Sequence, residues 1–197
     1  MTPLNKILSG FGALALAGLL ACGGGGGSTP PVTPTATGLA YTDPTTGTYL
    51  LKRNSTLSTA SHLVLDLVGP SSGTASGVSM TLSADAAKVT WVDVPAGGTT
   101  AALMQNGTQF SLGTGTPIQK AKATVGVLQA TVAQKAPAAA ASLNGALLRV
   151  ALDLKPGLGL TQGTAIPLSA DAAKCQVLDG AGTISTFTVT VGTLTAQ

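Results

Sequence analysis

Short runs in which apolar residues alternate with threonine or serine are the feature that most limits how this chain can fold. Three runs carry apolar side chains on every second residue: Leu63, Leu65 and Leu67; Val78, Met80 and Leu82; and Phe187, Val189 and Val191. A period of two buries one set of side chains and leaves the other in water, which is the pattern of a half-buried β-strand. The chain is therefore expected to fold as antiparallel sheet.

Ten β-rich runs, separated by Gly, Pro, Ser and Asn, are candidates for strands. They cover residues 48–52, 61–68, 77–82, 89–94, 109–112, 123–133, 146–154, 164–168, 175–178 and 183–191. Their number and the turn residues between them predict an all-β fold, a sandwich of about nine antiparallel strands. The alanine-rich stretch 136–142 favours helix, but Pro137 limits it to a turn or two or a loop.

Composition excludes several other classes of protein. Only 9% of the residues are charged, against roughly 25% in an average soluble protein, and all seven acidic residues are Asp. A coiled coil needs Glu, Lys and Arg at helical spacing, and two cysteines are too few for a disulfide scaffold. The ten basic residues are spread along the chain and form no patch in the sequence, so we expect no nucleic-acid partner.

The first 21 residues have the organisation of an export signal. One cation, Lys6, precedes an uncharged apolar stretch of about 15 residues, shorter than the roughly 20 that a membrane-spanning helix needs. The stretch ends in Leu19-Leu20-Ala21-Cys22, which resembles the lipobox of bacterial lipoproteins. The resemblance implies cleavage before Cys22 and attachment of acyl chains to that cysteine, which would anchor the protein in membrane lipid. An ordinary secretory signal and a short membrane helix are the alternatives.

A linker rich in Gly, Thr and Pro follows the cysteine. Five consecutive glycines make its first half flexible, and prolines stiffen the second. We therefore divide the chain into a signal peptide at 1–21, a lipidated Cys22 with its linker at 22–37, and one domain at 38–197. Because Gly23, and not Asp, follows the cysteine, the expected location is the outer membrane of a bacterial envelope, with its two sides left open.

One heptapeptide occurs twice in the expected domain. Leu-Ser-Ala-Asp-Ala-Ala-Lys stands at residues 82–88 and again at 168–174. In each copy the serine or the aspartate can cap a single helical turn between two strands. Each copy also follows, after a Gly-rich turn, a run containing Leu-Asp-Leu. The repeat predicts two similar hairpin-like units within one sandwich.

Residues 61–94 resemble the N-terminal half of bacterial cohesin modules. The resemblance consists of an alternating strand, a Gly-rich turn, the run Gly-Val-Ser-Met-Thr-Leu-Ser, a short turn with Asp85, and the valine-rich run 89–94. Residues 145–154, 166–168 and 179–192 look similar to the C-terminal half. Where cohesins have a Tyr-Asp pair, this chain has Ala84-Asp85. The resemblance implies a nine-stranded jelly-roll sandwich, a fold shared with some cellulose-binding modules, and transfers no binding site.

Residues for catalysis are hard to assemble. His62 is the only histidine, no Gly-x-Ser-x-Gly elbow is present, and a solvated or hydrogen-bonded role at the surface is the expectation for His62. Turn hydrogen bonds are the expected role of Asp66, Asp93, Asp153 and Asp179. No metal or cofactor motif is present, although one calcium ion held by Asp side chains and loop carbonyls stays open. We expect no enzyme and no cofactor.

Aromatic rings are the usual contacts of a carbohydrate-binding surface, and five remain after the signal. Among them, Trp91 and Tyr49 are the candidates for ligand contact. Trp91 could face solvent or fill the core, and the scarcity of rings favours the core. If Cys22 carries lipid, Cys175 has no partner and is expected to be a buried apolar residue.

Two functions fit these observations. The first is a membrane-anchored, non-catalytic, cohesin-like adhesion or scaffolding module that binds a protein of the cell envelope by a sheet face. The alternative is a carbohydrate-binding module that holds polysaccharide and is displayed by the same lipid anchor.

The anchor gives a direct prediction. The variant Cys22→Ser cannot form the thioether through which a lipoprotein signal is processed, so we expect an uncleaved precursor without lipid. Metabolic labelling with a fatty-acid probe, followed by electrophoresis, measures both properties. Continued labelling of the Cys22→Ser chain would refute the lipoprotein assignment.

Overall fold

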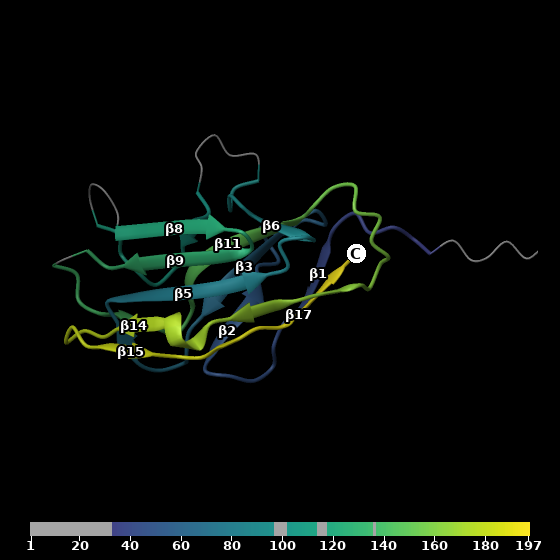
Figure 1. Ribbon diagram of the computed structural model, residues 1–197. Helices are drawn as coiled ribbons and strands as arrows, with labels where there is room; N and C mark the ends of the chain where they lie inside the picture. Colours follow the sequence, from purple (N-terminus) through teal and green to yellow (C-terminus); the bar gives the residue numbers. More distant parts are fainter. Residues whose placement is uncertain (1–32, 97–101, 114–117, 136) are drawn as a thin grey trace, which may run out of the picture. The chain divides into compact units, whose positions relative to one another are not determined.

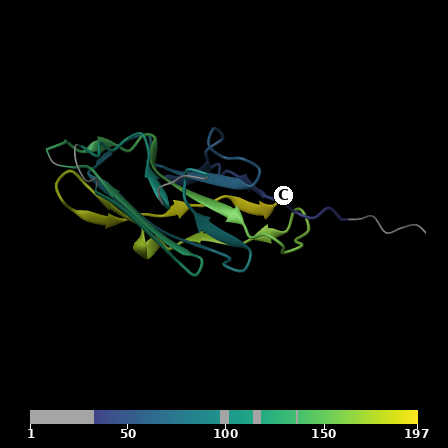
Figure 2. The same cartoon turned by 90° about the horizontal axis from the view of Figure 1, so that it is seen from above.

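Two six-stranded sheets enclose the core of the domain (Figures 1 and 2). The computed structural model describes residues 33–96, 102–113, 118–135 and 137–197. The compact unit that they form begins at Thr33, a few residues before the expected boundary, because Thr35 bridges to Thr161 and the Ala36 amide donates to the Leu160 carbonyl. Cys22 lies outside the described residues.

The first sheet has β3 and β11 at its centre. Its strands are, in order, β16 (Val189–Thr190), β2 (Tyr49–Arg53), β3 (His62–Val68), β11 (Ala146–Leu154) and β6 (Val89–Val92), and β7 (Met104–Asn106) also pairs with β11. All of its pairings are antiparallel except that of β16 with β2.

The second sheet lies in front of the first in Figure 1. Its strands are, in order, β15 (Ile184–Thr186), β14 (Gln176–Leu178), β5 (Gly77–Ala84), β9 (Val127–Ala133) and β8 (Ile118–Thr124), and β13 (Leu168–Ala170) also pairs with β5. All pairings in this sheet are antiparallel. One 3₁₀ turn, η1 (Ala172–Lys174), is the only helical element among the described residues.

Two small sheets complete the domain. The larger joins β1 (Leu39–Thr42), β17 (Thr193–Ala196) and β12 (Ala165–Ile166), and the smaller joins β4 (Thr74–Ala75) with β10 (Ala141–Ser142). Tyr41 ties β1 to the first sheet, because its hydroxyl donates to the Leu51 carbonyl (2.8 Å) and accepts from the Gly192 amide (2.6 Å). Burial raises the pKa of Tyr41 to about 12.

The alternating runs of the sequence form the inner faces of the sandwich. Leu63, Leu65 and Leu67 have no exposed surface, and Val78, Met80 and Leu82 meet them from the second sheet at 2% exposure or less. Phe187 and Val189 are buried and Val191 is partly buried against the same core. The expected all-β sandwich is therefore confirmed, and the period-two pattern identified the buried face of its strands.

Several strands differ from their expected ranges. The run 123–133 is the end of one strand and the whole of another, because Val125 and Gly126 both have positive φ and form a two-residue turn between β8 and β9. No strand forms at 109–112, where Phe110 is buried in a loop and accepts a hydrogen bond from Asn106. The short strands β1 and β17 were not expected, and they form by pairing with each other.

The two copies of the repeated heptapeptide pair with each other. Their first three residues lie opposite one another in antiparallel register, with Ser83 facing Ser169. Two equivalent hydrogen bonds flank this pair: the Asp85 amide donates to the Pro167 carbonyl (3.2 Å), and the Asp171 amide donates to the Thr81 carbonyl (2.9 Å). The pairing therefore has a local two-fold axis near Ser83 and Ser169.

Each copy forms the capped turn that the sequence predicts. Asp85 accepts from the Ala87 amide (2.9 Å), and Asp171 accepts from the Ala173 amide (3.1 Å). An ion pair of 2.8 Å joins each aspartate to the lysine that ends its copy. The symmetry ends there, because the first copy leads into β6 of the first sheet, whereas the second leads into β14 of the second sheet.

The turn between β8 and β9 gives a prediction for stability. Val125 has φ +42° although it is β-branched, and its side chain is 87% exposed. Positive φ is strained for such a residue and favourable for asparagine, particularly before glycine in a turn of this kind. We therefore expect Val125→Asn to raise the free energy of unfolding by about 1 kcal/mol in urea titrations. A loss of stability would contradict this assignment of strain.

Candidate binding surface

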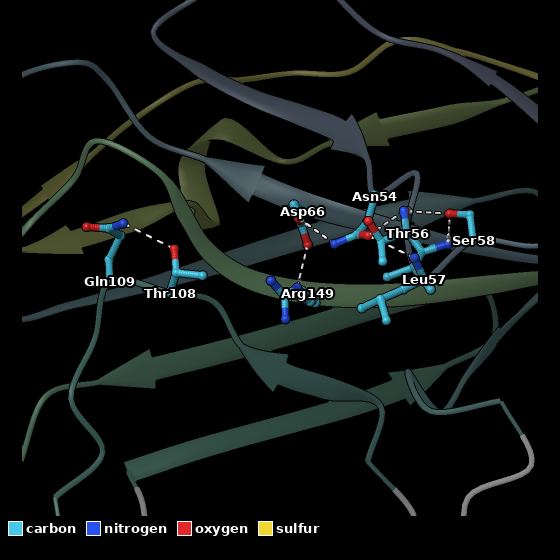
Figure 3. Close-up of polar contacts among 9 residues, drawn as sticks. Asn54, Thr56, Leu57, Ser58, Asp66, Thr108, Gln109 and Arg149 are labelled. Carbon is cyan, nitrogen blue, oxygen red and sulfur yellow. Dashed lines mark hydrogen bonds and ion pairs between the residues drawn. The ribbon is translucent and has the colours of Figure 1, made fainter.

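Asp66, on the outer face of the first sheet, holds the loop that follows β2. Its carboxylate accepts from Asn54 Nδ2 (2.9 Å) and pairs with Arg149 Nε on the neighbouring strand (2.9 Å), as Figure 3 shows. Asn54 in turn accepts from the amides of Thr56 (3.1 Å) and Leu57 (2.9 Å) with its side-chain oxygen. This network fixes residues 54–58 beside β3.

His62 fixes a second segment at the same face. Its Nδ1 lies 2.8 Å from Asp153 Oδ1, and its Nε2 lies 3.0 Å from the Val94 carbonyl oxygen. The expected hydrogen bonds are present, but the expected surface position is wrong: the side chain is only 6% exposed, because the ring lies beneath the segment that follows β6. Both ring nitrogens are engaged by acceptors of the protein, and neither is directed at a nucleophile.

The outer face of the first sheet is consequently covered in part. Val64 and Ala151 have no exposed surface there, and they pack with Val94 into a small second cluster outside the main core. Ser58 exchanges hydrogen bonds with the main chain of Val64, which holds the loop against the strand. This sheet therefore buries apolar side chains on both faces: the inner face packs in the main core, and part of the outer face packs against Val94.

All seven carboxylate side chains are engaged within the domain. Asp66 and Asp153 each form an ion pair with a basic side chain on the neighbouring strand of the first sheet. Asp85 and Asp171 each form one with the lysine of the same repeated turn. The others accept from main-chain amides: Asp43 from Arg53, Asp93 from Ala102, and Asp179 from Ala181 and Thr183. Hydrogen bonds were expected for four of these residues, and the structure shows them, although only Asp179 makes its bonds within a tight turn.

The outer face of the second sheet, in contrast, is largely uncovered. We call this surface the open face. Its residues come from alternate positions of five strands: Ile118, Lys120, Lys122, Gln129, Thr131, Ala133, Gly77, Ser79, Gln176, Leu178, Ile184 and Thr186. The strands β8, β9, β5, β14 and β15 follow one another from top to bottom in Figure 1.

An apolar row crosses one end of the open face. The register aligns Ile118 with Ala133, Gly77, Leu178 and Ile184 across all five strands. The isoleucines at the two ends of the row are 50% and 62% exposed. Between them the surface has a hollow around Gly77. An added Cβ at this position would meet Ala133 Cβ at 2.8 Å, so a larger residue than glycine would clash there.

Polar side chains occupy the next row of the open face. There the register aligns Lys120 with Thr131, Ser79, Gln176 and Thr186. Ser79 and Thr131 share a hydrogen bond of 2.9 Å between their hydroxyl groups. The open face therefore combines an exposed apolar row with a row of hydroxyl, amide and ammonium groups.

Sequence reasoning did not single out the residues of the open face. The alternation of lysine with alanine in Ile-Gln-Lys-Ala-Lys-Ala-Thr, at residues 118–124, was the available signal for β8. Because this run contains few strongly apolar residues, most of the strand was not predicted. No local feature shows that Ile118 and Ile184 lie in one row, because that row depends on pairings between distant strands.

The structure places both candidate ligand-contact rings in the interior. Trp91 is 6% exposed, and its indole donates to the Gly126 carbonyl at the tip of the β8–β9 hairpin (2.8 Å). Tyr49 is 7% exposed and packs against Phe187 with ring centroids 4.0 Å apart. The expectation that Trp91 fills the core is confirmed. Contact of either ring with a ligand stays a prediction, with little ring surface to support it.

Cys175 is a buried free thiol, as expected. It has no exposed surface, its Sγ lies 4.0 Å from the Thr81 carbonyl oxygen, and burial raises its pKa. Within the described ranges, no three His, Cys or Asp side chains gather as metal ligands. No helix in that same part of the chain is long and apolar enough to cross a membrane.

Solved cohesin domains are similar to this chain. A type II cohesin domain from the cellulosome of Acetivibrio cellulolyticus is 14% identical, with a TM-score of 0.52, and the match covers 73% of this chain and 91% of that one. A scaffoldin B cohesin of the same organism, solved with a dockerin, is 17% identical with a TM-score of 0.47, covering 68% and 86%. The cohesin module of a Clostridium perfringens family 33 glycoside hydrolase is 12% identical with a TM-score of 0.39, and the match covers 79% of this chain and 98% of that module.

No protein-family profile matches the sequence, and no curated protein matches it. The likeness to the type II cohesin domain supports the cohesin-like jelly-roll sandwich that the sequence suggests, at an identity that concerns the fold alone.

Proposed function

We propose that this chain is a non-catalytic protein-binding module that engages its partner through the open face. The observation that carries the proposal is the exposed apolar row from Ile118 to Ile184, on the sheet whose outer surface is largely uncovered in the described part of the chain. Exposed apolar rows beside polar groups are typical of surfaces that bind other proteins. The cohesin-like fold agrees with this role, since the family resemblance implies a binding module.

The polar groups of the domain support a role without catalysis. The only histidine has both ring nitrogens on protein acceptors, and every carboxylate is engaged in an ion pair or a main-chain hydrogen bond. A general acid or base needs a proton site that is directed at a substrate. In the described part of the chain, no histidine or carboxylate is left free for that task.

The proposal includes the anchor. Acyl chains on Cys22 would hold the protein at the outer membrane of a bacterial envelope, and the linker would give the domain freedom to reach a partner there. About ten residues separate the cysteine from Thr33, which corresponds to roughly 35 Å when fully extended. The partner is therefore expected among envelope proteins.

Polysaccharide binding receives less support from the surface. All five rings that follow the signal, Tyr41, Tyr49, Trp91, Phe110 and Phe187, are less than 10% exposed. Carbohydrate surfaces normally stack on exposed rings, and the open face offers none.

A single substitution tests the proposed face. Ile184→Asp places a charge at the end of the apolar row, where a partner would bury it without compensation. We expect the variant to capture the partner at least about tenfold less well than the wild type when both are used as bait for envelope proteins. Leu158→Asp is the matched control, because Leu158 is 42% exposed and belongs to a loop away from this sheet.

The outcomes separate the candidate functions. Capture that is lost in Ile184→Asp and kept in Leu158→Asp supports the open face. Equal loss in both variants, or no capture by either the wild type or the control, contradicts it. Retention of the wild type on insoluble polysaccharide, without capture of any protein, favours the carbohydrate-binding alternative.

A further inference from the structure

The acidic side chains of the domain all take part in contacts within it, whereas only some of the basic side chains do. All seven carboxylates are engaged, and the sequence contains no others on side chains. Four of the basic side chains share in these contacts, namely His62, Lys88, Arg149 and Lys174. None of the ion pairs among the described carboxylates includes Lys120 or Lys122.

These two lysines stand together on the open face. Lys120 and Lys122 are exposed, occupy alternate positions of β8, and point to the same side of the sheet. Their Cα atoms are about 7 Å apart at the rise of an extended strand, close enough for the two ammonium groups to repel each other. Their cross-strand neighbours, Thr131 and Gln129, are uncharged and do not neutralise them.

The two lysines lie beside the apolar row. Ile118, which ends that row, precedes Lys120 by two positions on the same strand and faces the same side. The hollow around Gly77 lies two strands away, about 10 Å at the usual spacing of strands. A partner that fills the hollow with an apolar side chain can therefore bring carboxylates to both ammonium groups.

We propose that the partner of the open face is an acidic protein surface with a protruding apolar side chain. This inference rests on the proposed function and adds the chemistry of the partner. The apolar side chain occupies the hollow between Ala133, Gly77 and Leu178, and carboxylates of the partner pair with Lys120 and Lys122. Rim charges of this kind increase the rate of encounter and select partners by sign.

A protein fits these observations better than an anionic lipid surface. A bilayer attracts exposed cations wherever they stand on the domain, which includes Arg53 and the partly exposed Lys52 and Lys155. The open face instead offers one hollow of limited size with two charges to one side of it. That arrangement is specific to a partner with a defined shape.

Labelled peptides test the inference on the full chain in mild detergent. The first probe is a hexapeptide with four carboxylates around two adjacent phenylalanines. The second replaces the phenylalanines with serines, and the third replaces the carboxylates with lysines. Fluorescence anisotropy measures binding, and circular dichroism checks that each variant keeps its fold.

We expect only the first peptide to bind, with an affinity that falls as salt is added. The double variant Lys120→Glu, Lys122→Glu should weaken binding by about tenfold, since two exposed ion pairs become repulsive. The control Lys52→Glu, Lys155→Glu changes the net charge equally and should leave binding unchanged. Ile184→Asp should weaken binding as well.

Other outcomes overturn the inference. They are no saturable binding at millimolar peptide, equal binding of the serine or lysine peptide, and equal loss in the control variant. Tighter binding of the chain to vesicles that contain an anionic phospholipid, with the same dependence on Lys120 and Lys122, assigns the face to lipid. If envelope-protein capture depends on Ile184 but not on these lysines, the acidic partner is wrong and the proposed function stands.

Discussion

The antiparallel pairing of β3 with β11 is the contact on which the rest of the structure depends. On its inner side it brings the leucines of both strands into the core. On its outer side it places Asp66 opposite Arg149 and Asp153 opposite His62, so each strand gives one acid and one base. These four side chains fix one segment beside β3 and one over the sheet, which gives the domain one partly covered outer face and one open face.

The same strands belong to the internal repeat, so this pairing joins the two equivalent units of the chain. Each copy of the repeat has an alternating strand followed by a capped turn, and two such units pair with each other in both sheets. Polar groups that lie between the copies are satisfied reciprocally, as at Asp85 and Asp171. The copies then diverge, since β6 joins the first sheet and β14 joins the second, whose outer face carries the exposed apolar row.

The parts of the structure that depend on local patterns could be predicted from the sequence. The period of two at Leu63, Leu65 and Leu67 identifies a buried face, and the heptapeptide identifies a capped turn, because both depend on neighbouring residues. The turn at Val125 was missed, since a β-branched residue rarely takes positive φ. The burial of His62 and the open face could not be predicted, because they depend on which loop covers which sheet. That is decided by contacts such as Asn54 with Asp66, between residues that the sequence does not mark as partners.

Site-specific photo-crosslinking in intact cells tests the central claim most directly, that a protein occupies the open face. A photoreactive amino acid in place of Thr131 stands at the centre of that face, and one in place of Thr56 stands on the loop beside β3 of the other sheet. Both positions are exposed. We expect a discrete protein adduct from position 131 and none from position 56. An adduct from position 56 alone, or equal adducts from both, would contradict it.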